Sequence, residues 1–98
     1  MNMQALMQQA KKMQKDMLEA KEQINNTIYE GTSSFVSVKL NGNKEIQEVK
    51  INKDIIEQDE MEMVQDMITV AINDAMKKID QDTEEKMGKY TKGMPGLF

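Results

Sequence analysis

Apolar and small residues recur with heptad spacing over the first quarter of the chain, from Met3 to about Thr27. Heptad spacing is typical of a helix that packs against another helix. The two rows of this seam hold Met3, Ala10, Met17 and Ile24, and Leu6, Met13, Ala20 and Thr27. On the outer face, Lys12–Asp16 and Lys15–Glu19 are spaced as solvated ion pairs would be. The pattern predicts an amphipathic, coiled-coil-like first helix.

Residues that favour β-structure follow this helix. After Asn25-Asn26, the segment Thr27-Ile28-Tyr29 is typical of a strand. The next segment, Gly31-Thr32-Ser33-Ser34, has the composition of a turn or loop. We therefore predict that the first short strand ends before Gly31.

A hairpin is predicted between Ser34 and Ile51. Asn41-Gly42 is a strong signal for a tight turn, because both residues can adopt a positive φ. On the return strand from Glu45 to Ile51, Ile46 has the opposite parity to the other apolar residues, which predicts a β-bulge or a second covered face. The apolar face of the hairpin holds Val36, Val38 and Leu40, with Val49 and Ile51. So small a sheet needs a helix to cover it.

A second, longer helix is predicted after an acidic segment. Asp59 and Glu62 have the spacing of a capping box at its start. Gly93-Met94-Pro95-Gly96 is expected to end it and to begin a loose tail over residues 91–98. Apolar residues recur near every 3.6 positions at Met61, Val64, Ile68, Ile72, Met76, Ile79, Thr83, Met87 and Tyr90. We expect the first half of this helix to pack on the sheet and the second half to project outward, where a partner helix can pack against it.

The composition favours one small domain, residues 1–98, that pairs with a second copy. Methionine contributes 11 residues and aromatic residues only 4% of the chain, so the core is built from flexible side chains. A monomer of this size is marginally stable, and oligomerisation is a common remedy. Cysteine is absent, and no basic leader or membrane-spanning segment is apparent. We expect a soluble, cytoplasmic homodimer.

The formal net charge of −4 conceals an uneven distribution. Between Asp54 and Met76 the chain holds seven carboxylates and no lysine, whereas the remainder is net positive. All 13 basic residues are lysines. The absence of arginine removes the usual bidentate reader of guanine.

The residue inventory argues against an enzyme, a metal site or a cofactor site. The chain has no His, Cys or Arg, and no glycine-rich phosphate loop precedes a helix. The acidic stretch from Asp54 to Asp66 lacks the glycine and the ligand spacing of a calcium loop, so helix capping and a solvated face explain it better. We expect no catalytic residue, metal, cofactor or small-molecule substrate.

Four short segments occur in one order along nearly the whole chain. They are Val36-Ser37-Val38-Lys39-Leu40-Asn41-Gly42, then Val49-Lys50-Ile51, then Ala71-Ile72-Asn73-Asp74-Ala75, and finally Glu85-Lys86-Met87-Gly88-Lys89 with Gly93. The set resembles the YbaB/EbfC family of bacterial nucleoid-associated proteins. The resemblance implies an α+β fold, an α-β-β-β-α protomer whose small antiparallel sheet is flanked by two long helices. It also implies a tweezer-like homodimer that binds DNA in the nucleoid without catalysis.

Lysines are the candidate functional groups, because phosphate contact requires only point charges. Two basic strips are predicted, with Lys11, Lys12, Lys15 and Lys21 on the first helix and Lys77, Lys78, Lys86, Lys89 and Lys92 toward the end. We expect weak, salt-sensitive DNA binding that tolerates many sequences. For each lysine, pairing with a neighbouring carboxylate for solubility is the alternative. For the whole protein, the alternative is an acidic dimeric protein–protein interaction module without DNA binding.

Overall fold

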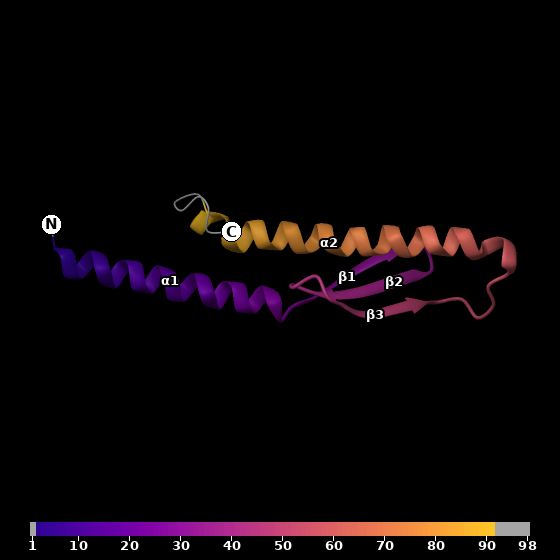
Figure 1. Ribbon diagram of the computed structural model, residues 1–98, viewed down its shortest axis with the longest axis horizontal. Coiled ribbons are helices and arrows are strands. Elements are labelled where there is room, and N and C mark those ends of the chain that lie inside the picture. The colour runs from indigo at the N-terminus through magenta and orange to yellow at the C-terminus, as the bar shows by residue number, and fades with distance from the viewer. Residues whose placement is uncertain (1, 92–98) are drawn as a thin grey trace.

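The computed structural model describes residues 2–91, which form an elongated rod measuring 71 × 20 × 14 Å (Figure 1). The elements are helix α1 (Met3–Asn25), strands β1 (Ile28–Ser33), β2 (Val36–Asn41) and β3 (Ile46–Ile51), a 3₁₀ turn η1 (Gln58–Glu60) and helix α2 (Met61–Thr91). The predicted α-β-β-β-α order is confirmed. No helix in this part of the chain combines the length and apolarity needed to cross a membrane. Lys92 and the predicted helix stop at residues 93–96 lie outside the described residues.

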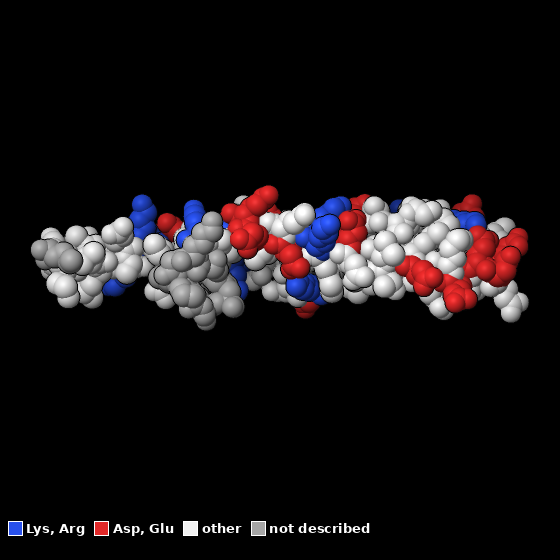
Figure 2. Space-filling model, turned by 90° about the horizontal axis from the view of Figure 1, so that it is seen from above, with Lys and Arg blue, Asp and Glu red and all other residues white. Residues whose placement is uncertain are grey.

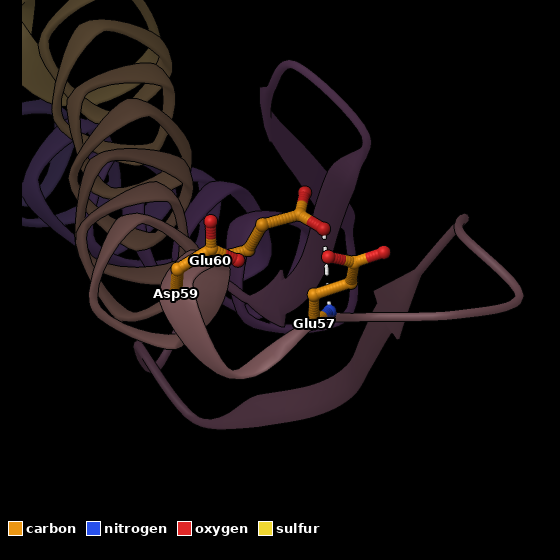
Figure 3. A group of neighbouring side chains, drawn as sticks. All are labelled: Glu57, Asp59 and Glu60. Atoms are coloured by element: carbon orange, nitrogen blue, oxygen red, sulfur yellow. Dashed lines mark hydrogen bonds between the residues drawn. The ribbon is translucent and has the colours of Figure 1, made fainter.

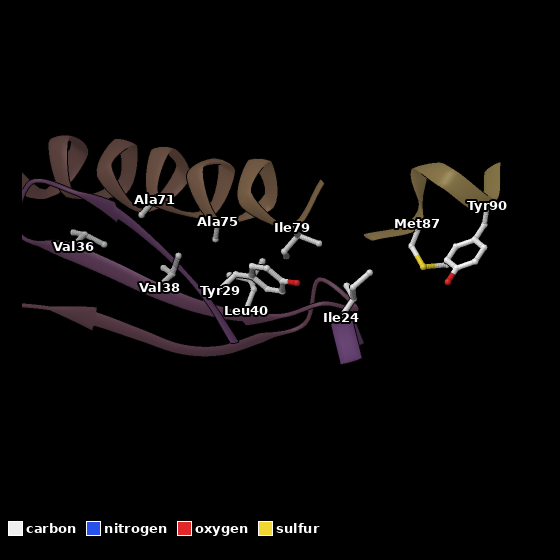
Figure 4. Close-up of a cluster of buried hydrophobic side chains, with 10 residues drawn as sticks. All are labelled: Ile24, Tyr29, Val36, Val38, Leu40, Ala71, Ala75, Ile79, Met87 and Tyr90. Atoms are coloured by element: carbon white, nitrogen blue, oxygen red, sulfur yellow. The ribbon is translucent and has the colours of Figure 1, made fainter. Parts of the chain in front are cut away.

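The three strands form one antiparallel sheet in the order β1-β2-β3, and α2 covers one face over β1 and β2 (Figure 1). Alternate β2 residues Val36, Val38 and Leu40 point toward α2 and are buried. They meet Ala71, Ala75 and Ile79 of α2 (Figure 4). The full buried cluster also holds Ile24, Tyr29, Met87 and Tyr90. The core therefore runs along the inner face of α2.

The predicted loop at Gly31-Thr32-Ser33 is wrong, because these residues belong to β1. The turn is only Ser34-Phe35, and Ser33 pairs with Val36 across it. Ser34 has φ 52°, the left-handed conformation that a two-residue hairpin turn requires. Gly31 is needed for another reason, since a Cβ there would clash with the Ala71 carbonyl oxygen and lie 2.6 Å from the Ala75 nitrogen.

The predicted hairpin after Asn41 is present, but a longer loop forms it. The Asn41 side-chain oxygen accepts hydrogen bonds from the backbone N–H groups of Asn43 (2.9 Å) and Glu45 (3.1 Å). The positive φ, 64°, lies at Lys44 and not at Asn41. The Asn41 side chain therefore organises the loop, and Gly42 provides space beside Ile24, whose carbonyl oxygen a Cβ would hit.

The predicted β-bulge on the return strand is confirmed. Val38 pairs with Val49 and Lys39 with Glu48, but Leu40 pairs with Ile46, so Gln47 is the extra residue. This shift places Ile46 on the same face as Val49, as its unusual parity required.

The cap that precedes α2 lies earlier in the chain than the predicted capping box. The Glu57 backbone N–H donates to Glu60 Oε1 (3.2 Å), and the 3₁₀ turn runs directly into α2. The reciprocal cap is thus Glu57 with Glu60, two residues before the predicted Asp59 and Glu62. The 3₁₀ turn explains the error, because it adds residues before the regular helical period.

The second half of α2 was predicted to project outward. It instead packs against α1 of the same chain. Met87 and Tyr90 are buried there, and Met17 and Ala20 of α1 pack against the same cluster. The N-terminal part of α1 extends beyond the described end of α2, and Leu6 and Met13 are exposed (Figure 1). The seam of α1 is therefore covered only toward its C-terminus, and its coiled-coil partner stays a prediction.

Tyr29 ties β1 to α2 through a short hydrogen bond. Its hydroxyl donates to Asp82 Oδ2 (2.5 Å), which also accepts from Lys86 Nζ (3.0 Å). Burial, followed by the contact with Asp82, raises the pKa of Tyr29 to about 12. The hydrogen bond from Tyr29, followed by the contact with Lys86, lowers the pKa of Asp82.

Replacing Tyr29 with Phe should lower the free energy of unfolding by about 1–2 kcal/mol at pH 7, because a hydrogen bond to a charged group is lost while Lys86 remains. Because the folded pKa lies above the ordinary value of 10.0, this contribution is complete below pH 10 and lost as the pH rises toward 12. Urea unfolding of both proteins at pH 7 and pH 11 should show the difference shrinking. Equal stabilities at pH 7 would contradict the assigned role of Tyr29.

Candidate nucleic-acid interface

Three of the predicted lysines form one basic face on α1. At about 100° per residue, Lys11, Lys12 and Lys15 lie within about 100° of one another around the helix. All three are exposed, and none pairs with a carboxylate in the described part of the chain. The ion pairs expected from spacing, Lys12–Asp16 and Lys15–Glu19, are not formed there. This helix face therefore presents three lysines without an ion pair to a described residue, although Glu19 and Glu22 line a groove with Lys11 and Lys15.

Two other predicted lysines, Lys89 of α2 and Lys21 of α1, each line a different pocket. Lys89 of α2 and Lys12 line a cleft of about 410 Å³ between the two helices, together with Asp16 and Tyr90. The Lys89 ammonium lies 5.0 Å from the centre of the Tyr90 ring. Lys21 lines a hollow of about 270 Å³ at the other end of α1, beside Lys44 of the hairpin loop. Lys89 and Lys12 therefore face the same cleft.

The predicted basic strip on α2 is interrupted by carboxylates. Lys78 Nζ lies 3.6 Å from Asp74 Oδ2 and donates to the Glu30 backbone oxygen (2.7 Å). Lys86 is bound by Asp82. Lys77 is exposed in a groove with Asp80, Gln81, Glu84 and Glu85. The lysines of α2 before Lys89 therefore serve the fold or lie among acids.

Acidic side chains gather at the end of the rod where β3 passes into α2, opposite α1 (Figure 2). This end holds Asp54, Glu57, Asp59, Glu60, Glu62 and Asp66, with Lys53 as its lysine. The two ends of the 71 Å rod thus differ in charge. A polyanion would meet repulsion at one end and attraction at the other.

Carboxylate oxygens of Glu57, Asp59 and Glu60 lie within 4.8 Å of one another (Figure 3). Glu60 is already used, because its carboxylate accepts from the Glu57 backbone and pairs with Lys53. The Lys53 contact, followed by the Glu57 backbone hydrogen bond, lowers the pKa of Glu60. The arrangement is thus explained by helix capping with a lysine counterion.

Lys50 on β3 is a lysine that the sequence analysis did not single out. It is exposed and has no ion pair with a described residue, whereas Lys39, Lys44 and Lys53 pair with Glu48, Asp80 and Glu60. Its place on a strand gave no helical spacing that would have grouped it with the other lysines.

Comparison with known proteins finds one family that matches nearly the whole chain. The sequence model of the YbaB/EbfC DNA-binding family matches residues 1–94. A nucleoid-associated protein of Lactococcus lactis subsp. cremoris is 44% identical over 97% of this chain and 98% of its own length. One of Chloroflexus aurantiacus is 43% identical over the full length of both chains.

The fold also resembles a solved structure. The uncharacterized protein HP0035 from Helicobacter pylori matches with a TM-score of 0.71 at 24% identity, covering 92% of this chain and 97% of that one. At this level of identity the likeness concerns the fold.

Proposed function

Because the chain belongs to the YbaB/EbfC DNA-binding family, we propose that it binds duplex DNA as a homodimer, mainly through contacts between lysines and backbone phosphates. The observation that carries this proposal is the exposed set Lys11, Lys12 and Lys15, which forms no ion pair with a described residue and lies on a helix that extends beyond the described end of α2. Lys89 adds a fourth cation at the α1–α2 cleft. Lysine ammonium groups neutralise phosphates without reading base edges, so binding tolerates many sequences.

The proposed place of action in the cell is the nucleoid. Relatives of this chain bear the name nucleoid-associated protein. A dimer with a basic α1 at each end could contact two stretches of DNA, bridging or reshaping it in the cytoplasmic nucleoid and affecting gene expression. The acidic end would face away from the phosphates.

A salt titration of the wild-type protein tests this function. Fluorescence anisotropy with a labelled duplex should give an affinity that falls steeply with salt, since each neutralised phosphate contributes a slope of about −0.9 in log K against log[salt]. Two duplexes of unrelated sequence should bind with similar affinity. The absence of binding even at low salt would instead favour the acidic interaction module, for which Ile55, 73% exposed beside the acidic cluster, offers an apolar contact.

The dimer is proposed to form through β3. Its outer edge is covered by no other strand of the sheet, and Ile46, Val49 and Ile51 are 51%, 45% and 37% exposed. These side chains share a face with buried Leu40, Val38 and Val36, their partners in β2, but lie beyond the cover of α2. A second copy pairing its own β3 would bury this apolar strip.

Replacing Val49 with Asp should weaken the dimer on the order of 100-fold, because an unpaired carboxylate in an apolar contact costs about 3 kcal/mol. Sedimentation equilibrium over a range of concentrations measures the change. The neighbouring Lys50→Gln variant, whose side chain points to the opposite sheet face, is the matched control. A wild-type protein that stays monomeric at high concentration would refute the dimer.

A further inference from the structure

The outer edge of β1 is covered by side chains from α2. The Thr32 backbone N–H donates to Asp74 Oδ2 (3.0 Å), and Lys78 Nζ donates to the Glu30 backbone oxygen (2.7 Å). Glu30 and Thr32 are two residues apart, so in an antiparallel pair both turn their backbone groups to the same side. These groups therefore face away from β2, toward the position that another strand would occupy.

Asp74 and Lys78 together imitate a partner strand. A neighbouring strand would offer a carbonyl oxygen to one group and an N–H to the other. Here the Asp74 carboxylate supplies the acceptor and the Lys78 ammonium supplies the donor. The two lie one helical turn apart, and their own 3.6 Å contact holds them together.

Close packing places α2 where it can reach this edge. Gly31 lies between Glu30 and Thr32, and its lack of a side chain lets β1 approach the backbone at Ala71 and Ala75. This gives a physical role to the Ala71-Ile72-Asn73-Asp74-Ala75 segment. The two alanines permit the approach, and Asp74 forms the contact.

The two edges of the sheet therefore differ. Backbone groups on an exposed strand edge readily pair with a strand of another chain. On β1, two of them are occupied by α2, whereas no described side chain donates to or accepts from the outer backbone groups of β3.

We propose that Asp74 and Lys78 form an edge lock, which closes β1 to strand pairing so that a second copy of this chain can join the sheet only at β3. Pairing β3 with β3 produces a closed dimer, because each copy uses the same edge. Pairing β3 of one copy with β1 of the next would leave an open edge at each end and continue without limit. The inference rests on the proposed homodimer for its consequence, but not on DNA binding.

The experiment removes the lock and measures assembly. The double variant Asp74→Ala, Lys78→Ala is compared with the wild type by sedimentation velocity over a range of concentrations. We expect concentration-dependent species in which the weight-average mass at least roughly doubles, as one dimer joins another. Hydrogen exchange at the Thr32 amide should accelerate, reporting that the cap is lost.

Tyr29→Phe is the matched control, since it removes another contact between β1 and α2 but leaves both edge contacts in place. It should keep the wild-type mass. Should the double variant fail to fold, Lys78→Met alone gives the same comparison at a half-exposed position.

Two results would overturn the edge lock. One is a folded variant with fast Thr32 exchange and wild-type mass at every concentration. The other is equal growth of the Tyr29→Phe control, which would assign assembly to general destabilisation. A monomeric wild type would refute the proposed dimer separately, and growth of the variant above that monomer would still support the lock.

Discussion

Replacing Lys11, Lys12 and Lys15 together with Glu is expected to reduce DNA affinity by at least about 100-fold at low salt, because three phosphate contacts per protomer become repulsions. The slope of log K against log[salt] should fall by about one for each lost contact. The loss should be similar for duplexes of different sequence, since the lysines read charge. Fluorescence anisotropy at several salt concentrations measures all three effects.

The control for this variant is a second triple substitution with the same change in charge. Lys39, Lys44 and Lys53 each already pair with a carboxylate, so their replacement by Glu should affect DNA affinity much less. Circular dichroism and sedimentation establish that both variants are folded and associate like the wild type. If both triple variants lost affinity equally, overall charge and not the α1 face would govern binding.

The expected loss of DNA affinity depends on which lysines are paired with carboxylates. Sequence spacing did not reveal this. Most of the candidate lysines have a carboxylate within four positions in the sequence, yet those of α1 form no ion pair with a described residue. Lys78 instead reaches the Glu30 backbone, 48 residues away, and the Asp82 that binds Lys86 also accepts from Tyr29, 53 residues away. Which charges are neutralised is thus decided by tertiary contacts.

The fold was more predictable than the site because side-chain periodicity determines it locally. The alternation of Val36, Val38 and Leu40 predicted the buried face of β2, and the parity of Ile46 predicted the bulge. Gly31 misled the prediction, since glycine signals a turn by its conformational freedom but is used here for its missing side chain. Only the position of α2 distinguishes these two uses.

The contact of α2 with α1 was missed for a similar reason. Charged residues crowd the second half of α2, which suggested a projecting helix. Met87 and Tyr90 nevertheless continue the buried stripe, and their partner surface on α1 lies more than 60 residues earlier in the chain. A narrow apolar stripe is sufficient where a second helix covers it.

Replacing Gly31 with Ala is expected to cause a large loss of stability, although the change adds only one methyl group. The new Cβ would clash with the Ala71 carbonyl oxygen, and would lie 2.6 Å from the Ala75 nitrogen and 2.9 Å from the Ala75 Cβ. Two of these atoms belong to the backbone of α2, so no side-chain rotation relieves the contact. The helix must move away from β1, which weakens the core and separates Asp74 from Thr32.

Overpacking of this kind costs about 3 kcal/mol, a large fraction of the roughly 5–15 kcal/mol by which small domains are stable. At about 4–8 °C per kcal/mol, the melting temperature should fall by roughly 10–25 °C. Gly88→Ala is the matched control, because among the described residues its Cβ would meet the flexible Glu84 side chain, whose Oε1 lies 3.3 Å away, and alanine favours the helix by about 1 kcal/mol. Thermal and urea unfolding should therefore move in opposite directions for the two variants. A Gly31→Ala protein as stable as the wild type would mean that α2 does not lie against β1 as closely as this structure has it, and both the Asp74 contact and the edge lock would lose their basis.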